Sequence, residues 1–163
     1  MMNEHRHLAW HETMELHELT VFQSLGLMKL KKTYPKITDP ELKKIYQQAI
    51  HSLTGNIQEL LRFYRMAPHM QREENLRVDE LPFYAGDLLA FLKTAVRNLA
   101  IAITETATPA LRAVLVKQLN GAIESHTAIY NYMYKKGYYP SYDLNRLLQN
   151  DVTIANTALS QKI

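Results

Sequence analysis

The sequence predicts an all-α fold: a four-helix bundle followed by a short fifth helix. Two observations support this. All six prolines fall between segments whose apolar residues recur with helical spacing, and no segment shows the alternation of a strand. Hydrophobic residues make up 47% of the 163 residues, which is enough for one core. We therefore expect a single domain over residues 1–163.

The first helix is expected over residues 8–34, and it poses a problem. At about 100° per residue, a buried stripe centred on Leu19 contains both Glu12 and Glu15. The same stripe includes the apolar or small residues Leu8, Leu16, Phe22, Gly26 and Leu30. A carboxylate that faces a core is costly unless it is paired, hydrogen-bonded or bound to metal. The two glutamates are therefore the first candidate site.

Four further helices are marked by their starts and ends. Asp39-Pro40-Glu41 is a typical helix start, and the second helix is expected to run to about Tyr64. The third is expected over 82–107. Thr108-Pro109 repeats the start signal for a fourth helix to about residue 136, where Gly137 is a good C-terminal cap. A fifth helix over about 142–159 is expected to lie across the bundle.

The topology of the bundle depends on the link between the second and third helices. Residues 66–81 are polar and lack an apolar stripe. Sixteen extended residues can cover about 50 Å, which is the length of a bundle. The other links are short and predict antiparallel hairpins. The sequence therefore favours a long crossover between helices 2 and 3, as in ferritin-like bundles.

Ferritin-like folds can hold two metal ions between Glu and Glu-x-x-His ligands, so we looked for that set. Glu12 and Glu15 are present, but the other helices offer amides where acids are needed. His126 could be a neutral core histidine or a ligand. Two interpretations stay open: a core polar layer without metal, or a degenerate site for Fe, Mn or Zn at Glu12, Glu15 and His126. The polar layer would comprise Glu15, Asn56, Gln118 and His126. We expect no bound cofactor.

Charge and composition exclude several classes of function. The net charge of +3 is small, and no nucleic-acid motif is present, so nucleic-acid binding is not expected. The chain contains no cysteine, which excludes disulfides and thiol chemistry. No apolar run reaches the length of a membrane span, and the N-terminus lacks the apolar region of a signal peptide.

Tyrosines concentrate near the end of the fourth helix. Six of the ten lie between residues 130 and 142. Tyrosine is favoured at protein interfaces, where the ring packs and the hydroxyl stays in water. We interpret five of them as candidates for an assembly surface: Tyr132, Tyr134, Tyr138, Tyr139 and Tyr142. Packing of the fifth helix is the alternative explanation.

Three stretches resemble the spore coat protein F (coat F domain) family of endospore-forming bacilli. They are HLAWHETMELHEL with LMKLKK, then ITDPELKKIYQQAI, then KKGYYPSYDL, in the family's order. The resemblance implies a ferritin-like bundle located in the spore coat or in the forespore or mother-cell cytoplasm. It also implies a structural role without enzyme activity. Its partners would be other coat or spore proteins, or further copies of itself, and the tyrosines could be oxidatively cross-linked there. The alternative is a ferritin-like metal-binding or redox protein with a degenerate site at Glu12 and Glu15.

Overall fold

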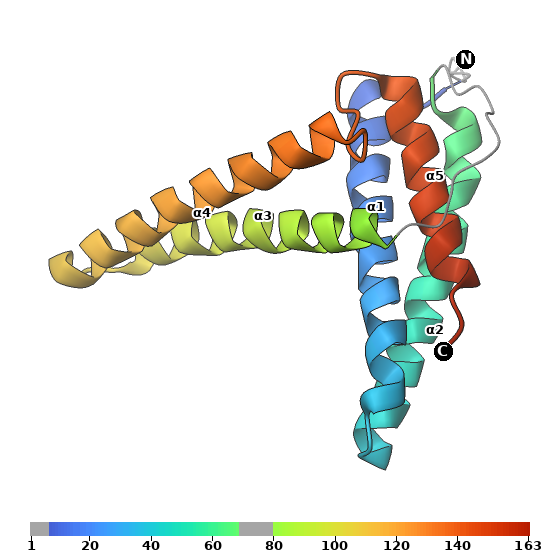
Figure 1. Cartoon of the computed structure of the whole chain (residues 1–163), viewed down its shortest axis with the longest axis horizontal. Coiled ribbons are helices and arrows are strands. Elements are labelled where there is room, and N and C mark those ends of the chain that lie inside the picture. Colours follow the sequence, from blue (N-terminus) through green and yellow to red (C-terminus); the bar gives the residue numbers. More distant parts are fainter. Residues whose placement is uncertain (1–6, 69–79) are drawn as a thin grey trace, which may run out of the picture. The chain divides into compact units, whose positions relative to one another are not determined.

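The computed structural model describes residues 7–68 and 80–163, and these form five α-helices without a strand. The helices are α1 (Trp10–Thr33), α2 (Pro40–Phe63), α3 (Leu81–Glu105), α4 (Pro109–Lys135) and α5 (Leu144–Ser160), as labelled in Figure 1. Short 3₁₀ turns follow α1 and α2 at Tyr34–Lys36 and Tyr64–Met66. The all-α prediction is confirmed, and each predicted helix lies within a few residues of its expected bounds.

The contacts divide the chain into two compact units, which we describe separately. The three-helix unit comprises Met1–Val78 and Pro140–Ile163 and contains α1, α2 and α5. The hairpin comprises Asp79–Tyr139 and contains α3 and α4. The predicted crossover falls on residues 66–81, of which 69–79 lie outside the described residues. The ferritin-like topology and the single domain over 1–163 stay predictions.

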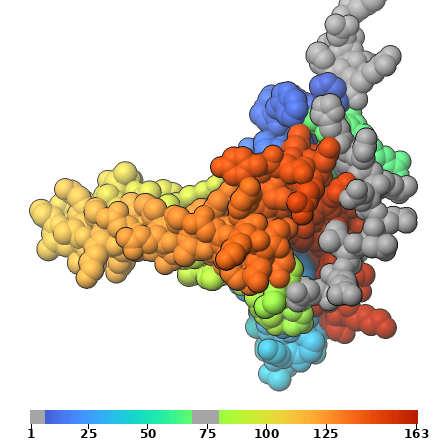
Figure 2. Space-filling model, turned by 45° about the horizontal axis from the view of Figure 1, so that its top comes forward, coloured from blue at the N-terminus to red at the C-terminus, as the bar shows by residue number. Residues whose placement is uncertain are grey.

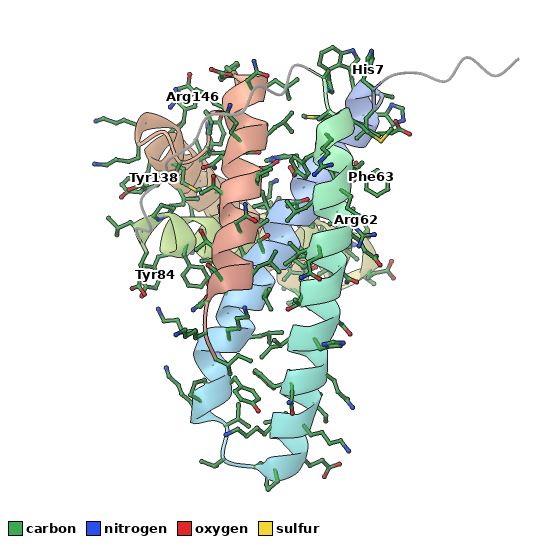
Figure 3. All side chains as sticks on the ribbon, turned by 90° about the vertical axis from the view of Figure 1, so that its right-hand side faces the viewer. His7, Arg62, Phe63, Tyr84, Tyr138 and Arg146 are labelled. Carbon is green, nitrogen blue, oxygen red and sulfur yellow. The ribbon has the colours of Figure 1, made fainter. Side chains whose placement is uncertain are left out.

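Helices α1 and α2 of the three-helix unit form the predicted antiparallel hairpin. Asp39 caps α2 through a 2.7 Å bond from the Leu42 backbone N–H, as the Asp-Pro-Glu pattern predicted. At the other end of the pair, the Leu8 backbone N–H donates to the Met66 carbonyl at 2.8 Å. Exposed Phe63 points outward from α2 (Figure 3).

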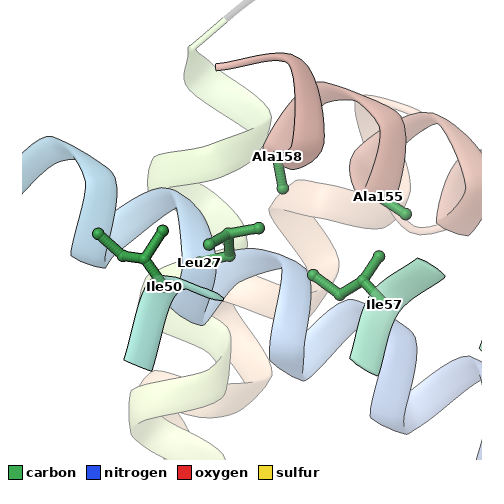
Figure 4. Close-up of a cluster of buried hydrophobic side chains, with 5 residues drawn as sticks. All are labelled: Leu27, Ile50, Ile57, Ala155 and Ala158. Atoms are coloured by element: carbon green, nitrogen blue, oxygen red, sulfur yellow. The ribbon is translucent and has the colours of Figure 1, made fainter. Parts of the chain in front are cut away.

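Helix α5 lies alongside α1 and α2, so the prediction that it crosses the bundle is wrong. Its start is capped by Asp143, whose side chain accepts from the Arg146 N–H. Small side chains allow close packing, because Ala155 and Ala158 are fully buried against the α1–α2 pair. Figure 4 shows the core cluster that these alanines complete: Leu27, Ile50, Ile57, Ala155 and Ala158. Large side chains at the two alanine positions would push the helix away.

The hairpin is held by a small apolar cluster between α3 and α4. Ala85 and Leu89 of α3 pack against Met133 of α4, and all three are buried. Beyond Met133 the chain turns at Gly137, whose φ of 73° suits a residue without a side chain, as the C-cap prediction required. In the space-filling view α4 runs along the surface of the hairpin (Figure 2, yellow to orange).

The buried face of α1 differs from the predicted one. Leu19 and Phe22, predicted inside, are 46% and 65% exposed. The buried face is centred about 110° away around the helix, at about 100° per residue. It contains mostly polar or small residues in steps of four and three: Thr13, His17, Thr20, Ser24, Leu27 and Lys31. This rotation moves the predicted site into solvent and brings a different set of residues into the core.

Candidate functional site: a buried polar network

Glu12 and Glu15 do not face the core, so the prediction that started from them is wrong on this point. Both side chains are exposed. The Glu12 carboxylate accepts a 2.8 Å hydrogen bond from the backbone N–H of Ala9. That is one half of a capping box, and it explains the residue as part of the start of α1. The exposed side chain of Glu15 contacts water and carries no desolvation cost.

The polar layer predicted from Glu15, Asn56, Gln118 and His126 draws on both units, so it stays a prediction. Within their own units, Asn56 and Gln118 are exposed, and His126 is half-buried on α4. Within residues 7–68 and 80–163 no three His, Asp or Glu side chains gather as metal ligands would. The expectation of no cofactor and the degenerate metal site both stay predictions.

A different polar cluster lies inside the three-helix unit, where α1, α5 and the end of α2 meet. His17 Nδ1 of α1 lies 2.8 Å from both carboxylate oxygens of Asp151 on α5. The hydroxyl of Tyr64, in the turn after α2, donates to Asp151 Oδ2 at 2.9 Å. At these distances one of the two partners, His17 or Asp151, donates a proton to the other in a hydrogen bond. We call His17, Tyr64 and Asp151 the buried triad.

The buried triad is enclosed by apolar and small side chains. The exposed fractions are 5% for His17, 2% for Tyr64 and 0% for Asp151. Burial is the main cause that raises the pKa of Asp151, and the bond and charge of His17 act in the opposite direction. Burial also raises the pKa of the Tyr64 hydroxyl, and the negative charge of Asp151 adds to this effect. Asp151 is therefore the shared hydrogen-bond partner that links His17 to Tyr64 inside the unit.

A second polar anchor joins α1 to the end of α5. Lys31 Nζ donates to the carbonyls of Ala158 at 2.6 Å, Leu159 at 3.1 Å and Gln161 at 2.8 Å. These carbonyls lie at a helix C-terminus, where backbone acceptors are unpaired and the helix dipole favours a cation. Burial lowers the pKa of Lys31. The lysine thus acts as a cap that reaches α5 from another helix.

The buried triad is better suited to holding helices together than to catalysing a reaction. A His–Asp pair can orient a general base, but catalysis also needs a nucleophile and a substrate next to the imidazole. None of the three residues is more than 5% exposed, so a substrate has no route to them in this arrangement. What the geometry does achieve is a fixed position for α5 against α1 and α2.

Sequence reasoning missed His17, Lys31 and Asp151, and it identified Tyr64 as the approximate end of the second helix. A signal was present: the polar stripe of α1 repeats in steps of four and three, as a packed helix face does. The stripe was overlooked because Leu19 and Phe22 form a more hydrophobic stripe on another side of the same helix. Asp151 is 134 positions from His17, and its pairing could not be read from spacing.

The predicted assembly tyrosines lie in two places. Tyr132 and Tyr134 of α4 are 40% and 47% exposed, and Tyr138 and Tyr139 are half-buried after α4. The Tyr132 and Tyr138 rings meet edge-on with their centres 6.3 Å apart. Tyr142 belongs to the three-helix unit and is 85% exposed. Their role at an interface stays a prediction.

The sequence of the chain is similar to those of known proteins. A family model described as the Coat F domain matches residues 82–142, which correspond closely to the hairpin. The spore coat protein F-like protein YraD of Bacillus subtilis (strain 168) is 33% identical over 85 residues, which are 52% of this chain and 84% of YraD. The chain belongs to the spore coat protein F family. The predicted resemblance is confirmed.

A second relative of the chain is shorter than YraD. The uncharacterized protein YraE of the same organism is 41% identical over 51 residues, which are 31% of this chain and 78% of YraE. No solved structure matches the chain. No helix in the described ranges is both long and apolar enough to cross a membrane.

Proposed function

We propose that this member of the spore coat protein F family is a structural component of the spore coat that acts through protein–protein contacts and catalyses no reaction. The observation that carries the proposal is the match to the Coat F domain and to YraD. Two features of the described residues support it. The buried triad is closed to substrates, and large apolar side chains remain on the surface.

The test of this role is the location of the protein in spores of its own organism. An antibody against the chain should detect it in the coat extract and lose the signal after the spores are stripped of their coat. Vegetative cells grown without sporulation serve as the control and should lack it. A constant level in vegetative cells, or a spore signal that survives removal of the coat, would contradict the proposal.

We further propose that the α3–α4 hairpin belongs to a ferritin-like four-helix bundle, whose second hairpin is either α1–α2 of the same chain or α3–α4 of another copy. A four-helix bundle requires two antiparallel hairpins that bury their apolar sides against each other. The pair α3–α4 is one such hairpin, and its length suits a bundle of ordinary size. The tyrosines Tyr132, Tyr134, Tyr138, Tyr139 and Tyr142 are proposed as further contacts with coat proteins.

A further inference from the structure

One side of the hairpin carries apolar residues that α3 and α4 leave uncovered. Phe91 is 66% exposed, and three further leucine or valine side chains are between 46% and 50% exposed. Half-buried alanines lie between them on α3. We call this set the hairpin face: Leu88, Phe91, Ala95, Ala102, Leu111 and Val114.

The helical wheel places these residues on a single side of the hairpin. At about 100° per residue, the α3 members lie about 100–160° around the helix from Leu89, and the α4 members lie about 40–100° around theirs from Met133, in the same rotational sense along the chain. The inward sides are marked by Leu89 on α3 and Met133 on α4, which pack together. Because the helices are antiparallel, the same sense on both puts the two apolar stripes side by side. The result is a continuous surface rather than scattered exposed residues.

The hairpin face contains no charged residue. Its polar members on α4 are Gln118 and Ser125, which lie in the same angular range. The nearest charges stand at its two long edges. Asp87 and Glu105 line the α3 edge, whereas Lys117, Glu124 and Lys135 line the α4 edge, which keeps a net positive charge. An apolar centre with charged edges is the usual anatomy of a protein interface.

We infer that the hairpin face binds the same face of a second copy of this chain, so that two α3–α4 hairpins form a four-helix bundle. The inference rests on the proposed contact role and names its partner. A two-fold axis parallel to the helices lays α3 of one copy over α4 of the other. This arrangement brings the acidic edge of each copy to the basic edge of its partner, so the edges are complementary in charge.

The area of the hairpin face is sufficient for a stable dimer. Helices of 25 and 27 residues are about 40 Å long, and two side by side are about 20 Å wide. A flat face of that size presents about 800 Å² from each copy, which is the usual size of a specific interface.

Charge argues for a second hairpin rather than for α1 as the occupant. The exposed apolar residues of α1, Leu19 and Phe22, share their stripe with the exposed carboxylates of Glu12 and Glu15. Burial of those carboxylates against a face without cations would be costly. A second hairpin face brings no charge with it. The family match supports this choice, because it covers residues 82–142 and YraE is too short to contain five helices of these lengths.

Sedimentation equilibrium of the full chain tests the inference with a matched pair of variants. The wild-type chain should be a dimer. Phe91→Lys places a charge in the hairpin face and should weaken dimerisation at least about tenfold. Ile101→Lys is the control, because Ile101 is 62% exposed on the same helix but points away from the face. A monomeric wild type, or equal weakening by both variants, would overturn the inference.

Cross-linking provides a second test that does not disturb the face. The chain has no cysteine, so a single introduced thiol reports on one position. Ala95→Cys lies in the hairpin face and should give a covalent dimer with a short bis-maleimide. Ala100→Cys, exposed on another side of α3, should remain monomeric under the same conditions. Equal yields, or a monomer in which the thiol introduced at position 95 is protected from the reagent, would overturn the inference.

These measurements separate the inference from the proposed coat function. Both use purified chain and need no spore. A chain that dimerises through the hairpin face but is missing from coat extracts contradicts only the proposed function. A chain that is present in the coat but monomeric in both assays contradicts only the inference.

Discussion

The three-helix unit and the hairpin solve the problem of packing helices in different ways. The three-helix unit buries polar side chains that are paired with each other or with backbone, at the triad and at Lys31. The hairpin buries only a small apolar cluster, and its exposed apolar side chains form a face without charge, whereas Leu19 and Phe22 of α1 share their stripe with exposed glutamates. Polar pairs fix one arrangement because a wrong partner leaves a group without hydrogen bonds. An uncharged apolar face accepts another surface, and this difference suits a stable scaffold joined to a contact module.

The largest loss of stability is expected from a substitution of Asp151 in the three-helix unit. Asp151→Ala removes the buried hydrogen-bond partner that His17 and Tyr64 share and should cost the three-helix unit about 3–5 kcal/mol of unfolding free energy. Urea unfolding followed by far-UV circular dichroism and by the fluorescence of Trp10, the one tryptophan of the chain, measures it. Asp143→Ala on the same helix removes only a cap and should cost about 1 kcal/mol. Equal costs would show that the triad does not hold α5.

The next largest effect is expected at the second anchor. Lys31→Met keeps the apolar stem but removes the ammonium from three carbonyls, and it should cost about 2–3 kcal/mol. Hydrogen exchange of the last turn of α5 should accelerate before the rest of the helix. Lys44→Met, an exposed lysine of α2, is the control and should change little. Unchanged exchange near Ala158 would mean that the apolar contacts alone hold this end.

A smaller effect at neutral pH, with a distinctive pH dependence, is expected for Tyr64→Phe. Loss of the bond to Asp151 should cost about 1 kcal/mol. The folded protein holds the phenol proton above the ordinary pKa of 10.0, whereas the unfolded chain releases it. The wild type should therefore lose stability as pH rises above about 10, by up to about 1.4 kcal/mol per pH unit.

Unfolding curves at pH 8 to 11 measure this dependence. Tyr64→Phe should flatten the alkaline part of the profile, because the group that titrates is gone. Tyr142→Phe is the matched control, since that ring is 85% exposed and should leave the profile as it is. A steep alkaline loss that persists in Tyr64→Phe would assign it to other groups.

Helix existence could be predicted from the sequence, because proline positions and caps act locally. Asp39 and Gly137 behave as their sequence contexts predicted. The buried side of α1 could not be predicted from the sequence, because an apolar stripe and a polar stripe compete on that helix. Which of them is buried depends on α5, which follows more than a hundred residues later. Alanines at 155 and 158 let α5 pack closely on the polar stripe, and the more hydrophobic stripe at Leu19 and Phe22 stayed exposed.

The exposed positions of Glu12 and Glu15 follow from the same competition between stripes. Glu15 was selected as a polar residue on an apolar stripe, and the error in the stripe carried over to the site. The members of the buried triad come from three segments, and their distances depend on tertiary packing rather than on spacing. Polar residues in steps of four and three are the one local feature that could have indicated them.

The smallest change in stability is expected in the hairpin, at the exposed residue Ile101. Ile101→Ser should change the unfolding free energy by less than about 0.5 kcal/mol, because the side chain is 62% exposed and gains little from folding. Leu89→Ala, at a buried position of the same helix, should cost about 2–3 kcal/mol. Both are measured by urea unfolding at a low protein concentration that favours the monomer. A cost above about 1 kcal/mol for Ile101→Ser would mean that another surface covers this side of α3. The side of α3 that carries Ile101 would then belong to a buried contact in addition to the hairpin face.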